Sequence, residues 1–138
     1  MKISLLKIVV LISALLVGAR AGAETKPGSW AELKAYHGVM SSTFHPAEEG
    51  KLEPIKTRSA ELAAAAKAWL KSTPPAEFNK PAILAKLKLL DVESAALDKL
   101  IKRGKATDTE ITATLTKVHD RFHEIVGACA DEGKAAKK

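Results

Sequence analysis

The chain of 138 residues contains one cysteine, few aromatic residues and no segment in which apolar and polar residues alternate. Because Cys129 has no second cysteine to pair with, no disulfide forms within the chain. Aromatic residues make up only 4% of the sequence, so Leu, Ile and Ala must supply most of the core. Alternation with a period of two is typical of half-buried strands. The lack of an alternating pattern predicts an all-α protein, and the single cysteine predicts one without internal disulfides.

Several chemical motifs are also missing. The sequence contains no glycine-rich phosphate loop, no nucleophile elbow and no Glu-x-x-His pattern of di-iron bundles. Glu48 and Glu49 are adjacent, so their side chains point in different directions and do not form an acid–base pair. Basic and acidic residues are interspersed, whereas nucleic-acid-binding proteins show a concentrated basic face. We therefore expect a protein that is neither an enzyme nor a nucleic-acid binder.

Residues 1–23 are predicted to be an export signal that is cleaved off. A basic start precedes an apolar run over 8–17, and both Ala19-Arg20-Ala21 and Ala21-Gly22-Ala23 fit a small-x-small cleavage site. The apolar run is shorter than the ~20 residues of a membrane span. We expect a mature chain of residues 24–138, without a membrane span, in the periplasm or secreted.

Residues 24–138 are predicted to form one domain of four helices. Ser29 and Glu32 form a capping box at the start of the first helix, and Thr107 and Glu110 form one at the start of the last. Pro46 is expected to end the first helix at the preceding residue. The expected helices cover 29–45, 53–72, 79–103 and 108–130. Their short links favour an up-down-up-down four-helix bundle.

Each predicted helix carries an inward stripe with steps of three and four residues. The second to fourth helices have stripes of Ile55, Ser59, Leu62, Ala66 and Trp69; of Ile83, Leu87, Leu90, Ser94, Leu97 and Ile101; and of Ile111, Leu115, Val118, Phe122, Ile125 and Cys129. In the first helix the stripe reads Trp30, Leu33, His37, Met40 and Phe44. A histidine therefore stands where a core leucine is expected.

The histidines predict a metal site. His119 and His123 are separated by four residues on the last helix, and the midpoints of the first and last helices, His37 and residue 119, are expected at the same level. Imidazoles bind zinc, copper and nickel, and two on consecutive turns form a pre-organised pair. The sequence predicts a transition-metal site of His37, His119 and His123, completed by Met40 or His45. Its function would be metal carriage, buffering or sensing.

The second to fourth helices resemble four-helix cytochromes of the cytochrome c′ type. The link Thr73-Pro74-Pro75-Ala76-Glu77-Phe78, followed by Lys80-Pro81-Ala82-Ile83, is similar to the family's entry into its third helix. The family's last helix carries Cys-x-x-Cys-His-Asp-x-Phe/Tyr-Arg, where this chain has Leu115-Thr116-Lys117-Val118-His119-Asp120-Arg121-Phe122-His123. The resemblance implies a four-helix fold with His119 at the haem-ligand position.

The chain departs from this family at the haem attachment. Leu115 and Val118 stand where the two thioether cysteines belong, so haem cannot be held covalently. The b-type four-helix cytochromes instead use a methionine on the first helix and a histidine on the last, and Met40 and His119 resemble that pair. A protein that binds haem b non-covalently, for electron transfer or gas binding, is therefore the first alternative.

A metal-free helical interaction protein is the second alternative. In that case His119 and His123 are solvated residues beside the buried stripe, and His37 is hydrogen-bonded to Tyr36, Ser41 or a carboxylate. Cys129 is interpreted as a small buried residue. A homodimer, through Cys129 or through a helix face, is left open.

Overall fold

The computed structural model describes the backbone of residues 29–135 and the side chains as far as residue 127. It contains the helices α1 (Ala31–Glu48), α2 (Glu53–Lys71), α3 (Pro81–Lys102) and α4 (Asp108–Ala135), and a short 3-10 turn, η1 (Ala76–Phe78). This part of the chain has no strand, which confirms an all-helical fold with four helices. The predicted export signal and the side chain of Cys129 lie outside the described residues. No described helix is long and apolar enough to cross a membrane.

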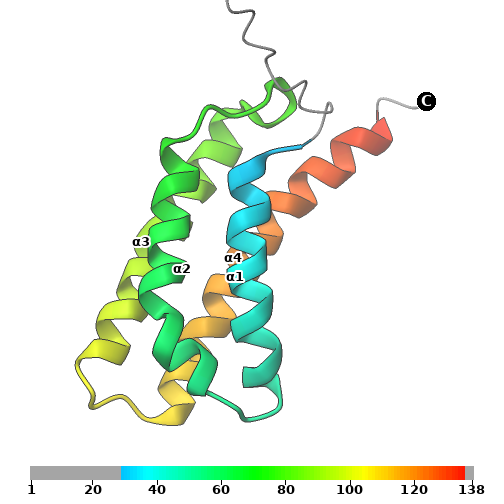
Figure 1. The fold of residues 1–138 in the computed structure, drawn as a ribbon. Helices are drawn as coiled ribbons and strands as arrows, with labels where there is room; N and C mark the ends of the chain where they lie inside the picture. The colour runs from blue at the N-terminus through cyan, green and yellow to red at the C-terminus, as the bar shows by residue number, and fades with distance from the viewer. Residues whose placement is uncertain (1–28, 136–138) are drawn as a thin grey trace, which may run out of the picture.

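The four helices pack around one core. α2 packs closely on α1 and α3, and α3 packs closely on α4, whereas α1 and α4 make the sparsest contact between neighbours. Figure 1 shows the α1–α2 and α3–α4 connections at one end of the molecule and the α2–α3 connection at the other. The backbones of α1 and α4 thus approach each other closely at fewer positions than those of the other neighbouring helices.

The predicted cap of α4 is confirmed. The Thr107 backbone N–H donates to Glu110 Oε2 at 2.7 Å, and the Glu110 N–H donates back to Thr107 Oγ1 at 3.2 Å. The corresponding prediction at Ser29 is wrong. α1 begins after Trp30, whose carbonyl accepts the Lys34 N–H at 3.2 Å, and no side chain caps this end.

The prediction that Pro46 ends the first helix is also wrong, because α1 continues through it to Glu48. Proline removes one helical hydrogen bond, but Pro46 lies in the last turn, where the loss is local. The Lys51 N–H donates to the Pro46 carbonyl at 2.9 Å and the Gly50 N–H donates to the Ala47 carbonyl at 3.0 Å. With Gly50 at φ +78°, these bonds form a Schellman motif that ends the helix.

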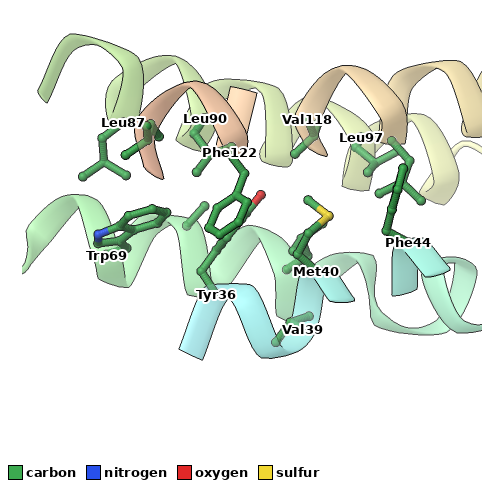
Figure 2. Close-up of a cluster of buried hydrophobic side chains, with 14 of the residues drawn as sticks. Tyr36, Val39, Met40, Phe44, Trp69, Leu87, Leu90, Leu97, Val118 and Phe122 are labelled. Atoms are coloured by element: carbon green, nitrogen blue, oxygen red, sulfur yellow. The ribbon is translucent and has the colours of Figure 1, made fainter. Parts of the chain in front are cut away.

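The predicted stripes of the other three helices match the core closely. All five stripe residues of α2 are buried, as are the first five of α3 and of α4, while Ile101 is partly buried. The stripe of α1 is wrong at one position: His37 is exposed, and its neighbour Tyr36 is fully buried. Figure 2 shows Tyr36, Met40 and Phe44 pointing from α1 into the space between the helices.

Tyr36 takes the interior position because its hydroxyl finds a partner there. Its Oη lies 3.0 Å from Ser94 Oγ on α3, and both residues are 0% exposed. Burial raises the pKa of Tyr36 far above its ordinary value, although the Ser94 hydrogen bond acts in the opposite direction. The phenol therefore stays neutral and able to donate a hydrogen bond inside the core.

A second buried polar contact joins α2 to α3. Ser59 Oγ donates to Asp98 Oδ1 at 2.8 Å, and Lys102 Nζ donates to Asp98 Oδ2 at 2.6 Å. Burial favours the neutral acid, but the hydrogen bonds from Lys102 and Ser59 outweigh it and hold the pKa of Asp98 below its ordinary value. The ionised carboxylate thus stabilises the folded chain.

We predict opposite effects of two glycine-to-alanine substitutions in α1 and its cap. Gly38 is an exposed helical residue with open space where an alanine Cβ would lie, so Gly38→Ala should raise the free energy of unfolding by about 0.5–1 kcal/mol. Gly50→Ala should lower it by about 1 kcal/mol, because φ +78° is strained for alanine. Urea unfolding monitored by circular dichroism measures both, and equal effects would contradict the Schellman end.

We predict that Asp98→Asn lowers the free energy of unfolding at pH 7 by about 1–3 kcal/mol, because the buried Ser59 hydroxyl and the Lys102 ammonium lose a charged acceptor. Since the folded pKa lies below the unfolded value of about 3.9, this stabilisation is present above that pH and is lost as the pH falls through the folded pKa. The two proteins should therefore converge in stability once the pH lies below the folded pKa of Asp98. Glu49→Gln, which alters an exposed pair with Lys51, is the matched control and should change little.

Candidate functional site

All four histidines lie along the contact between α1 and α4. Together with two phenylalanine rings they form what we call the ring row, which runs in the order His37, Phe122, His123, His119, Phe44 and His45. Neighbouring ring centroids in this order are 5.3, 5.6, 4.4, 3.6 and 6.1 Å apart. The sparsest helix contact of the core is thus lined by imidazole and phenyl rings.

The closest polar contact in the ring row joins the two histidines of α4. Nε2 of His119 and Nε2 of His123 are 3.0 Å apart, and their rings are inclined by 74°. Without a metal, this distance is that of a hydrogen bond in which one ring donates its N–H to the other. We call these two imidazoles the histidine pair. Their Nε2 atoms lie next to each other beside α4.

The orientation of α4 is fixed from its other flank. Glu93 of α3 accepts hydrogen bonds from Arg121 Nε at 3.1 Å and from Arg121 Nη2 at 3.2 Å, and its side chain is only 13% exposed. Lys117 Nζ lies 3.4 Å from the same carboxylate. Because Arg121 and Lys117 face α3, the histidine pair is turned toward α1.

His119 is the more enclosed member of the pair. Its side chain is 22% exposed, and one ring face stacks on Phe44 at an interplanar angle of 7°. Burial and the charge of nearby His123 lower the pKa of His119, against the opposing influence of Asp120 and Glu48. The folded protein therefore favours the neutral imidazole, which is the form that binds a metal.

The expected meeting of three histidines is not observed. His37 is exposed and stacks on Phe122, whereas His119 stacks on Phe44, one to two turns further along α1. Because α1 extends past Pro46 to Glu48, its midpoint lies closer to Met40 than to His37. α4 also extends past the expected residue 130 to Ala135, so both midpoints that placed His37 level with His119 were misplaced.

The two proposed completing ligands are also separated from the pair. His45 is exposed, and its Nδ1 lies 3.1 Å from Glu48 Oε2. Met40 is 1% exposed and belongs to the core. Within the described residues, no group of three or more His, Cys, Asp or Glu side chains is placed to hold a metal ion. The structure brings together two of the predicted ligands, His119 and His123.

Met40 and His119 are not placed to bind one haem iron together. Nε2 of His119 is directed at His123 on the flank of α4, whereas Met40 is buried in the core. Phe44, one turn beyond Met40, covers a face of the His119 ring. Four surface pockets of about 290–500 Å³ lie near the α1–α2 and α3–α4 connections and along α3, and neither residue lines them. A haem between these two residues would require Phe44 to move.

The histidine pair fits a metal ion better. Two imidazole nitrogens bound to one tetrahedral metal at 2.0–2.1 Å are about 3.3 Å apart. The two Nε2 atoms, which are 3.0 Å apart, therefore need to separate by only about 0.3 Å to bind one metal ion. Asp120 Oδ1 lies 3.9 Å from Nδ1 of His119, on the side of the ring away from Nε2, which is too far for a hydrogen bond between them.

Sequence reasoning identified the histidines but missed the two phenylalanines as their neighbours. Phe44 and Phe122 belong to the predicted buried stripes, and both are indeed buried. Each also presents a ring face to a histidine at the edge of the core. No local signal predicts these stacks, because Phe44 stacks on His119 and Phe122 stacks on His37, each across two helices.

Comparison of the chain with protein-family models, curated proteins and solved structures finds no match. The resemblance to the four-helix cytochromes therefore stays a prediction. The functional proposal for this chain depends on the geometry of the ring row.

We predict that the imidazole of His119 titrates below the ordinary value of about 6.5 in a two-dimensional NMR titration of metal-free protein. Phe44→Leu should raise this pKa by exposing the ring, and His123→Ala should raise it by removing a neighbouring positive charge. His37→Asn is the matched control and should leave it unchanged. A pKa at or above 6.5 for His119 in the native chain would contradict the packing on Phe44.

Proposed function

We propose that this chain is an exported, periplasmic or secreted protein with an up-down-up-down four-helix bundle, and that it binds a transition-metal ion through His119 and His123. The N-terminal basic and apolar pattern supports export. The short connections between consecutive helices support the topology. The role is metal carriage, buffering or sensing rather than catalysis.

One observation carries the metal proposal: Nε2 of His119 and Nε2 of His123 lie 3.0 Å apart. Two imidazole nitrogens at this separation need to move only slightly for both to contact one metal ion. Two imidazoles already held together lose little rotamer freedom on binding, so the entropic cost is small. The lowered pKa of His119 also favours metal binding, because a smaller fraction of this imidazole is protonated near neutral pH and fewer protons must be displaced by the metal.

Imidazole donors favour zinc, copper and nickel over magnesium and calcium, which prefer oxygen ligands. The pair contributes no thiolate, and Met40 is enclosed in the core. The donor set is therefore purely nitrogen, as in many zinc and copper(II) sites. No observation in the described residues favours haem over these ions.

We predict that purified protein binds zinc, copper(II) or nickel in isothermal titration calorimetry and that each of His119→Ala and His123→Ala weakens binding by at least about tenfold, or ~1.4 kcal/mol. The double variant should show no binding above background. His37→Ala is the matched control, since His37 is exposed and lies outside the pair. This variant should bind as the native chain does.

Two outcomes would overturn the proposal. Unchanged affinity in the double variant would show that the pair is not the site and would favour the metal-free interaction protein. An intense absorption band near 400 nm, with iron in protein isolated from its own host, would favour haem. Circular dichroism of each variant verifies that the helices are intact.

A further inference from the structure

The histidine pair provides only half of a tetrahedral metal shell. Zinc in proteins is almost always four-coordinate, and stable sites fill all four positions with side chains. The pair supplies two nitrogens, and the described part of the chain brings no third His, Cys, Asp or Glu into the same group. A zinc ion on this pair therefore has two positions that the described residues of the same chain do not fill.

The open side of the pair is accessible to another macromolecule. His123 is exposed, and His119 keeps 22% of its side chain in contact with solvent. A helical repeat of 3.6 residues places Thr112, Thr116 and Gly127 on the same side of α4 as the pair. Thr116 and Gly127 are exposed, and open space surrounds the place that a Cβ at Gly127 would take.

These flanking positions favour a close approach by a helix. Thr112, Thr116 and Gly127 are short, and the Thr116 hydroxyl is turned back to the Thr112 carbonyl at 2.9 Å. The helical repeat places Asp120, whose side chain is 70% exposed, at the edge of this surface. Among the described residues of α4, the three positions that flank the pair therefore present no long or charged side chain to a second α4.

We propose that one Zn²⁺ ion joins two copies of this chain, with His119 and His123 of each copy forming a four-imidazole shell. This inference rests on the proposed function, because it requires the pair to bind the ion. Two such pairs related by a two-fold axis through the ion supply four nitrogens in tetrahedral geometry. The second copy is thus the partner that completes the site, in a contact that exists only with metal.

The test measures zinc stoichiometry and molar mass together. Purified metal-free protein is titrated with zinc chloride in a calorimeter and examined by sedimentation velocity with and without zinc. We expect 0.5 zinc per chain, a doubling of the mass with zinc, and return to the monomer on addition of EDTA. His119→Ala combined with His123→Ala should remain monomeric in zinc.

Two further variants separate this contact from others. Thr116→Arg leaves both ligands in place but brings two cations together at the contact, so it should weaken zinc-dependent dimerisation at least tenfold while zinc still binds. Val92→Arg is the matched control: Val92 is 64% exposed on α3, away from the pair, and its substitution should leave the zinc-dependent mass unchanged. Thermal unfolding of both variants verifies their fold.

The possible outcomes are distinguishable. One zinc per chain with a monomer mass would overturn the paired site and leave the proposed function standing. No zinc, copper or nickel binding would overturn both. A dimer that forms without zinc would overturn the inference. A dimer that is abolished by Val92→Arg but not by Thr116→Arg would also overturn it, because the contact would then lie on another surface.

Discussion

The packing of Tyr36 in the core determines how α1 is oriented against α4. Its ring packs 5.5 Å from Trp69 and 5.7 Å from Phe122, and its hydroxyl pairs with Ser94, so one side chain contacts α2, α3 and α4. Aromatic pairs in this range add to the stabilisation from area burial. Because Tyr36 occupies the interior, His37 is rotated to the surface. This rotation decides which histidines meet.

The histidine pair owes its geometry to two different constraints. The spacing of four residues on one helix brings the imidazoles of His119 and His123 to consecutive turns. The ion pair of Arg121 with Glu93 holds the opposite flank of α4 against α3, and Phe44 supports the His119 ring from α1. The pair is therefore pre-organised by contacts to two other helices, at the side of the core where α1 and α4 meet.

Much of the fold was predictable from local patterns, and the errors have identifiable causes. The stripe of α2 was correct at every position, because its small and apolar residues follow one clear period. α1 was harder, because Tyr36 and His37 are both amphipathic and each fits a stripe with steps of three and four. Pro46 is a local stop signal, but α1 continues past it and ends at the Schellman motif around Gly50. Because α1 and α4 both extend beyond their expected ends, their midpoints did not predict which residues face each other.

The sequence by itself determined four helices, their buried faces and the nearness of His119 to His123, since all of these follow from hydrophobic period and helical spacing. Only the tertiary structure decided that His37 and His45 stand apart from the pair, that Met40 is closed in the core and that Phe44 covers His119. These facts depend on how far each helix extends and how it is rotated about its axis. Both are set by contacts such as those of Tyr36 and Glu93 with residues distant in the chain, which no local pattern contains.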